Sequence, residues 1–129
     1  MEYLADTVTI IRHFSGTGRI GRQAKSILEG VERGEHHMFL STISLVEILY
    51  LSEKKRITIN LGESLEMMDE STNYSVVDLT PDIVKLAENI DFPDIFDRLI
   101  ISTAQYLGAS LLTSDRAIRN RDLVETIWS

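Results

Sequence analysis

A chain of 129 residues with 43% hydrophobic and 26% charged residues predicts a single domain, residues 1–129, with a core of ordinary size. The chain has no cysteine, no apolar run near the ~20 residues that a membrane helix needs, and no signal-peptide pattern at its acidic start. This argues against disulfide scaffolds, thiolate zinc sites and membrane proteins, and it fits a reducing cytoplasm. The net charge of −7 disfavours direct neutralisation of nucleic-acid phosphates by the protein, but not an approach to phosphates through bound metal ions.

In the first half of the chain, short apolar runs alternate with stretches of helical periodicity. The predicted elements are, in order, a strand at Tyr3–Ala5, a helix at Val8–Phe14, a helix at Ile20–Glu32, a strand at Met38–Leu40 and a helix that follows Ser41 or Thr42. We expect the inner side of the last helix to carry Leu45, Val46, Leu49 and Tyr50.

The second half continues the alternation of strands and helices. Asn60, Thr80 and Asp94 are each placed to cap a helix, and Pro81 suits a first helical position. Three further strands are predicted at Ser75–Val77, Ser110–Leu112 and Val124–Trp128. One turn of helix is predicted at Arg116–Arg119, between the last two strands. Short apolar strands that alternate with helices predict the α/β class, with a parallel sheet covered on both faces.

Acidic residues fall where parallel sheets bind ligands, beyond the carboxyl ends of the strands. Asp6 and Asp115 each follow a predicted strand, whereas Glu47 and Asp97 lie near the starts of two helices. Close carboxylates raise each other's pKa unless a cation compensates them, and all-oxygen ligands suit Mg²⁺ or Mn²⁺ rather than zinc. Such a site would serve metal-assisted phosphodiester hydrolysis. Helix caps, or a glutamate that reaches solvent at position 47, are the plainer alternatives.

Segments Leu4–Thr7, Ser41–Leu51, Phe96–Ala104 and Leu111–Ile118, in this order, resemble the PIN-domain family. Within that family the sequence is most similar to the VapC-type toxin ribonucleases of toxin–antitoxin pairs. The resemblance implies a PIN-like three-layer α/β/α sandwich with a central parallel sheet of about five short strands. It also implies metal-dependent cleavage of RNA, a homodimer, and a cognate antitoxin that reaches the acidic pocket.

For individual residues, the resemblance implies that Asp6 and Asp97 are the main metal ligands. Glu47 would help to bind metal or to position water, and Asp115 would be the fourth acid. The metal would be Mg²⁺ or Mn²⁺, and either Thr113 or Ser114 would hydrogen-bond a carboxylate. Arg98 is typical of its motif but need not be catalytic.

One residue departs from the family pattern. Many members have Asn after the Asp-Thr pair, where this chain has Val8, so another polar group must position the ligands or metal affinity is lower. Two sets of basic residues are candidates for RNA binding despite the negative net charge: Arg116, Arg119 and Arg121, and Arg19, Arg22 and Lys25.

Three other functions remain to be weighed against the nuclease. The first is a PIN-like module that lacks activity and binds RNA or protein. The second is a phospho-receiver, in which Asp78 after the third strand would be the acceptor. The third is a metal-free ribonuclease that uses two histidines, but we expect His13, His36 and His37 to lie at the surface.

Overall fold

The computed structural model describes all residues from Met1 to Ser129. Five strands form one sheet in the order β3-β2-β1-β4-β5, and every pair of neighbours is parallel. The strands are β1 (Glu2–Ala5), β2 (His37–Ser41), β3 (Tyr74–Val77), β4 (Ser110–Leu112) and β5 (Thr126–Ile127). The helices are α1 (Thr7–Ser15), α2 (Arg22–Glu32), α3 (Thr42–Glu53), α4 (Leu61–Glu70), α5 (Pro81–Ala87), α6 (Ile95–Leu107) and α7 (Arg116–Arg119).

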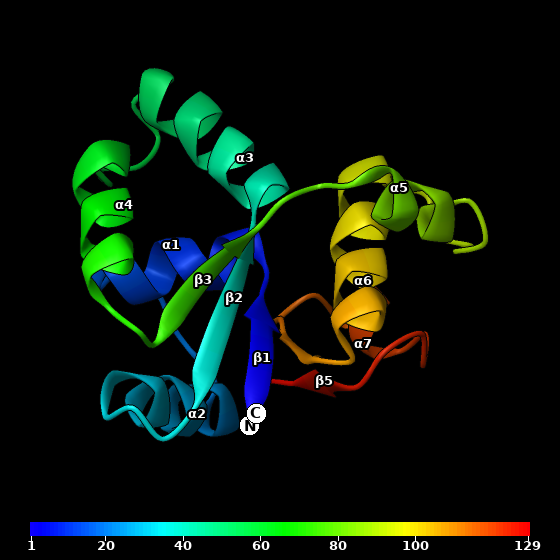
Figure 1. The fold of residues 1–129 in the computed structure, drawn as a ribbon, viewed down its shortest axis with the longest axis horizontal. Helices are drawn as coiled ribbons and strands as arrows, with labels where there is room; N and C mark the ends of the chain where they lie inside the picture. Colours follow the sequence, from blue (N-terminus) through cyan, green and yellow to red (C-terminus); the bar gives the residue numbers. More distant parts are fainter.

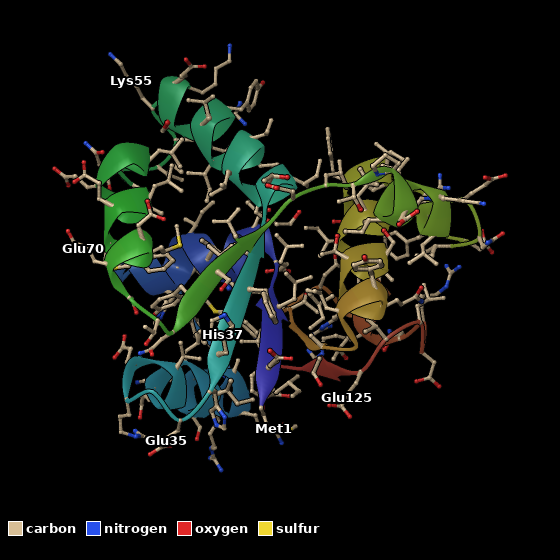
Figure 2. All side chains as sticks on the ribbon, in the orientation of Figure 1. Met1, Glu35, His37, Lys55, Glu70 and Glu125 are labelled. Carbon is tan, nitrogen blue, oxygen red and sulfur yellow. The ribbon has the colours of Figure 1, made fainter.

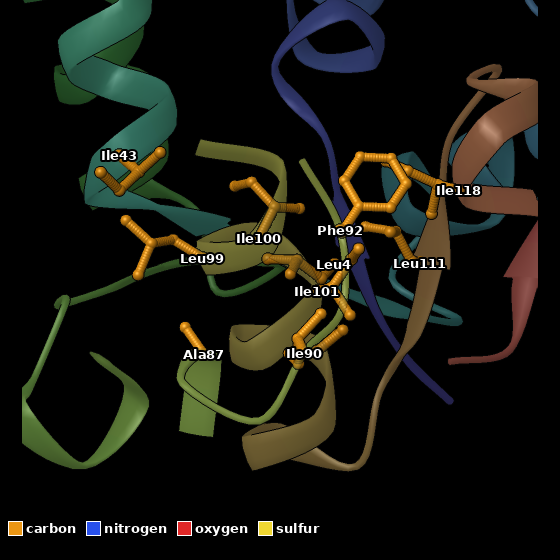
Figure 3. Close-up of a cluster of buried hydrophobic side chains, with 11 residues drawn as sticks. Leu4, Ile43, Ala87, Ile90, Phe92, Leu99, Ile100, Ile101, Leu111 and Ile118 are labelled. Atoms are coloured by element: carbon orange, nitrogen blue, oxygen red, sulfur yellow. The ribbon is translucent and has the colours of Figure 1, made fainter. Parts of the chain in front are cut away.

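The helices cover both faces of the sheet (Figure 1), which confirms the predicted three-layer α/β/α sandwich with a central parallel sheet of five short strands. Alternate residues of β1 point to opposite faces, so Leu4 belongs to one apolar cluster and Tyr3 and Ala5 to the other. Figure 3 shows the first cluster, where Ile100 and Ile101 of α6 lie beside Leu4 and residues from several other elements. The second cluster joins the sheet to α1, α2, α3 and α4.

This arrangement sets the carboxyl ends of the central strands β1, β2 and β4 side by side, because the three strands are parallel neighbours. Each of the three is followed directly by a helix start or a short polar turn. Labelled acids elsewhere, such as Glu35, Glu70 and Glu125, lie at the periphery in Figure 2. A ligand-binding site is therefore expected at the carboxyl edge of the sheet.

The prediction for the inner face of α3 was wrong for three of its four residues, and only Leu45 is partly buried. Val46, Leu49 and Tyr50 are 59%, 45% and 54% exposed, whereas Ile43 and Ile48 of the same helix are buried. Apolar residues occur almost all round this helix, so periodicity alone cannot choose the face that packs.

Strand β5 is shorter than predicted. It pairs with β4 only through Thr126 and Ile127, and the carbonyl of Trp128 instead accepts a hydrogen bond from the amide of Ala24 in α2, at 3.0 Å. The end of the chain thus leaves the sheet to contact a helix start. No helix is both long enough and apolar enough to cross a membrane.

Candidate active site

Asp6 leaves the end of β1 and caps α1. Its Oδ1 accepts a hydrogen bond from the amide of Thr9 at 2.9 Å, and its Oδ2 accepts one from Thr113 Oγ1 at 2.6 Å. Burial raises the pKa of Asp6 above its usual value, although these hydrogen bonds lower it. Asp6 is therefore both a helix cap and a carboxylate held in a fixed position, so the two interpretations of this residue do not exclude each other.

Thr113 connects Asp6 to the fourth predicted site residue. It is fully buried after β4, and its Oγ1 also accepts the backbone amide of Asp115 at 3.1 Å. Asp115 in turn caps α7, with Oδ1 accepting from the amides of Ala117 and Ile118 at 2.8 and 3.2 Å. Of the two residues predicted to support a carboxylate, Thr113 does so and Ser114 does not.

Glu47 is held by a residue that the sequence interpretation missed. Thr7 Oγ1 donates to Glu47 Oε1 at 2.7 Å and lies 2.9 Å from Ser44 Oγ, which is fully buried. A signal was available, because Thr7 stands directly beside Asp6 at a helix start. Val8, which follows the Asp6-Thr7 pair, is 44% exposed, and the hydroxyls of Thr7 and Thr113 hold Glu47 and Asp6.

Asp97 lies in the first turn of α6 and is half-buried. Asp94 caps that helix as predicted, since its Oδ1 accepts from the amide of Asp97 at 3.0 Å. The Asp97 pKa is raised to about 6, first by burial and then by the negative charges of Asp94, Asp115, Glu47 and Asp6. The field of all the other predicted site residues thus reaches this one carboxyl group.

Asp97 thus lies near enough to three acids from other parts of the chain for their charges to raise its pKa. We call the four residues the acidic edge: Asp6, Glu47, Asp97 and Asp115. In the structure, no three of its side chains lie close enough to hold one metal ion jointly. Three of them are engaged in hydrogen bonds, and repulsion keeps like charges apart. The donor chemistry nevertheless fits Mg²⁺ or Mn²⁺, because every available ligand is a carboxylate oxygen and no histidine or cysteine is present among them.

Arg98 lies outside the acidic edge. Its Nη2 donates to the carbonyl of Ala87 at 2.7 Å, so it joins α6 to the end of α5. We therefore assign Arg98 to the packing of these helices.

The histidines, which we expected at the surface, are each partly buried, and the His13 side chain is only 10% exposed. His13 packs against Phe14 and Tyr74, with Nε2 at 3.2 Å from the Tyr74 hydroxyl, and burial lowers its pKa. His36 packs edge-on against Tyr3, and His37 pairs with Ser75 at 2.7 Å. His36 and His37 stand at the amino end of β2, the opposite edge of the sheet from the acids.

The position of Asp78 argues against the phospho-receiver interpretation. Asp78 follows β3, which is the outermost strand on its side of the sheet, and its side chain is exposed. The strand order differs from the 2-1-3-4-5 order of receiver folds. Asp78 therefore does not occupy a central acceptor pocket.

Comparisons with known proteins agree with this architecture. The sequence matches the PIN domain family over residues 3–123, and no curated protein sequence matches it significantly. VapBC2 from Rickettsia felis, bound to a DNA fragment from their promoter, is 15% identical with a TM-score of 0.71 over 98% of both chains. A toxin–antitoxin complex from Klebsiella pneumoniae is 18% identical with a TM-score of 0.64, over 97% of this chain and 95% of that one. FitAcB from Neisseria gonorrhoeae is 16% identical with a TM-score of 0.66, over 98% of this chain and 96% of that one.

Proposed function

Because the chain belongs to the PIN domain family, we propose that it is a metal-dependent endoribonuclease and the toxin of a type II toxin–antitoxin pair. One observation supports the nuclease most directly: burial and four neighbouring carboxylates raise the pKa of Asp97 to about 6. Charged groups gathered in this way need a cation to compensate them. Mg²⁺ or Mn²⁺ is the cation that these oxygen ligands suit.

Each residue of the acidic edge has a proposed role. Asp6 and Asp97 would be the main ligands of a bound metal, and Asp115 would be the fourth acid of the site. Glu47, fixed by Thr7, positions the attacking water or binds metal. When bound there, a divalent ion would supply an activated water and would stabilise the leaving oxygen of the phosphodiester. The hydroxyl of Thr113 hydrogen-bonds both Asp6 and the backbone amide of Asp115, so these two acids are held in place before substrate arrives.

The proposed partners are an antitoxin and a second copy of the chain. Structures that share the fold include toxin–antitoxin complexes, which supports the antitoxin. Val46, Leu49 and Tyr50 of α3 are exposed, as are Ile95 and Phe96 of α6, and exposed apolar side chains on these two helices support a homodimer. The alternative function, a PIN-like module without activity that binds RNA or protein, is favoured only by Val8 and is therefore the weaker candidate.

The nuclease is tested by incubating the purified protein with RNA and Mg²⁺ or Mn²⁺, against a parallel reaction with EDTA. We expect cleavage that needs the metal and that Asp97→Asn lowers by more than about 100-fold, since even outer partners of metal ligands typically give 10–100-fold losses. The matched control is Asp94→Asn, the same chemical change three residues away, where Asn can still cap α6.

Full activity in Asp97→Asn would contradict the assignment of the site. Unaltered RNA at high Mn²⁺ would favour the binding module. Where cleavage occurs, the product ends distinguish attack by water, which leaves a simple phosphate monoester, from attack by the RNA 2′-hydroxyl, which leaves a cyclic phosphate. Only the first outcome agrees with a metal-activated water.

A further inference from the structure

Next to the acidic edge lies a cavity that gathers five of the nine arginines of the chain. Its volume is about 740 Å³, and Ser114, Gln23 and Trp128 also line it. We call it the arginine groove and define it by its five arginines: Arg12, Arg19, Arg22, Arg116 and Arg119. Smaller cavities that share several of these residues adjoin it on two sides.

No acidic side chain lines the arginine groove, although the chain has 20 acidic residues, and no ion pair of the structure involves its arginines. The three ion pairs of the structure involve His13, Arg33 and Arg121 instead. Five unpaired guanidinium groups around one cavity indicate a ligand with several negative charges, because like charges that converge without a partner repel one another.

Two of the guanidinium groups are held in place by neutral partners. Arg12 Nη1 donates to the carbonyl of Arg19 at 2.8 Å, and Arg119 Nη2 donates to Ser129 Oγ at 3.2 Å. Neither bond uses a carboxylate, so the positive charge remains available to a ligand. The groove is therefore partly ordered before any ligand enters it.

The arginine groove and the acidic edge share two helices. Asp6 caps α1 and Arg12 lies in its last turn, about 9 Å further along the helix axis at 1.5 Å per residue. Asp115 caps α7, and Arg116 and Arg119 lie within that helix. Along α1 and α7 the arginines therefore lie within about two helical turns of Asp6 and Asp115, close enough for one polyanion to reach both regions.

Trp128 gives the arginine groove an aromatic surface. Its indole is partly exposed and lines the cavity together with Arg22 and Arg116. It packs so closely against Gly21 that a Cβ there would come within 2.8 Å of its ring and 2.4 Å of its carbonyl oxygen. A fixed, partly exposed aromatic ring beside arginines is a surface on which an unpaired base can stack.

We propose that the arginine groove binds the phosphate backbone of a single-stranded nucleic acid, with Trp128 stacking against one of its bases. The identification of this strand as the substrate rests on the proposed nuclease function, while binding itself does not require cleavage. The groove also resolves the conflict between a net charge of −7 and a polyanionic ligand, because the positive charge is concentrated where the strand would lie.

The chain carries its own reporter for this test, because Trp128 is its only tryptophan. A single-stranded RNA oligonucleotide is titrated into the full-length protein in EDTA, and tryptophan fluorescence is followed. We expect quenching, and at least about tenfold weaker binding in the double variant Arg22→Gln/Arg116→Gln. The slope of log affinity against log salt should fall by about 1.4, or about 0.7 for each phosphate contact with a single strand.

The matched control is Arg33→Gln/Arg56→Gln, which changes the net charge equally at two exposed positions outside the groove. We expect it to weaken binding less than about twofold. Equal weakening in both double variants would overturn the proposal, as would unchanged fluorescence. Equal binding of duplex RNA would overturn the assignment to a single strand, and displacement of the RNA by an equal charge of polyglutamate would indicate an acidic protein segment instead.

The two proposals fail in different ways. Quenching by RNA with no cleavage at any metal concentration would leave the groove in place and remove the nuclease. Metal-dependent cleavage that is the same in the parent and in Arg22→Gln/Arg116→Gln, together with equal binding, would keep the nuclease and remove the groove.

Discussion

The acidic edge and the arginine groove are neighbours on α1 and α7, but they are built in opposite ways. The acids of the edge are partly buried, and Asp6, Glu47 and Asp115 each accept a hydrogen bond from another part of the molecule or from a helix start. The arginines of the groove are more exposed and have no charged partner. Three acids of the edge are thus fixed by hydrogen bonds, whereas the arginines of the groove form a more exposed, positively charged surface that suits a flexible polyanion.

Short of replacing a proposed metal ligand itself, the largest effect should come from removing the support of the acidic edge. In Thr113→Val, Asp6 Oδ2 loses its donor and the amide of Asp115 loses its acceptor. We expect cleavage to fall by about 10–100-fold, as for other groups that orient metal ligands. The free energy of unfolding should fall by about 1–3 kcal/mol, because buried polar groups lose their partners.

The control for this change is Thr103→Val, the same substitution at another buried threonine. Thr103 Oγ1 donates only to the carbonyl of Leu99 within α6, at 2.7 Å. Initial cleavage rates and denaturant unfolding of both variants make the comparison. Equal losses of activity in the two would mean that Thr113 serves the core and not the site.

A smaller effect concerns the response of metal-free protein to pH. The folded-state pKa of Asp97 is about 6, above the 3.8 of an ordinary aspartate, so between these values the folded protein holds a proton that the unfolded chain has lost. The free energy of unfolding should therefore contain a contribution that decreases as pH rises from about 4 to 6. We expect it to be about 1 kcal/mol, because the half-exposed side chain is screened by solvent.

This contribution is measured as the difference between the parent and Asp97→Asn in thermal or denaturant unfolding from pH 4 to 7 in EDTA. The variant should gain stability relative to the parent as pH rises. Added Mg²⁺ should stabilise the parent at pH 7 and have little effect on the variant. Parallel pH curves for the two proteins would contradict the crowding of carboxylates at the acidic edge.

The smallest effect should come from a single arginine of the groove. In Arg22→Gln we expect RNA affinity in EDTA to fall by only about two- to fivefold at 0.15 M salt, the range of a single exposed charge contact. The salt slope should fall by about 0.7. If the loss of RNA affinity were as large as the loss of cleavage expected for Thr113→Val, the groove would, like the acidic edge, hold its side chains in fixed positions.

The acidic edge was easier to predict from the sequence than the arginine groove. The acids follow strand ends or open helices, and such positions are visible as local patterns, so the sandwich and the convergence of Asp6 and Asp97 on one edge were predictable. Thr7 was missed because a threonine at a helix start does not reveal which distant acid it will hold.

The arginine groove was only partly predictable. Arg19, Arg22, Arg116 and Arg119 were candidates for RNA binding, but nothing local showed that they meet, or that Arg12 joins them while Arg121 and Lys25 do not line the same cavity. They meet because β1 and β4 are neighbours in the sheet, which places α1 beside α7, and because Trp128 binds the start of α2. The face of α3 was mispredicted for a related reason, since only its neighbours decide which apolar side packs.

The hydrogen bond between Thr113 and Asp6 has a consequence for biosynthesis. It joins residues 107 positions apart, and β1 acquires its β4 neighbour only when both strands are available. A chain emerging from the ribosome at about 5–20 residues per second therefore exposes Asp6 and Glu47 for several seconds before Thr113 arrives. The proposed toxin would be harmless through almost all of its own translation, and an antitoxin already present could meet it at the moment the acidic edge is completed.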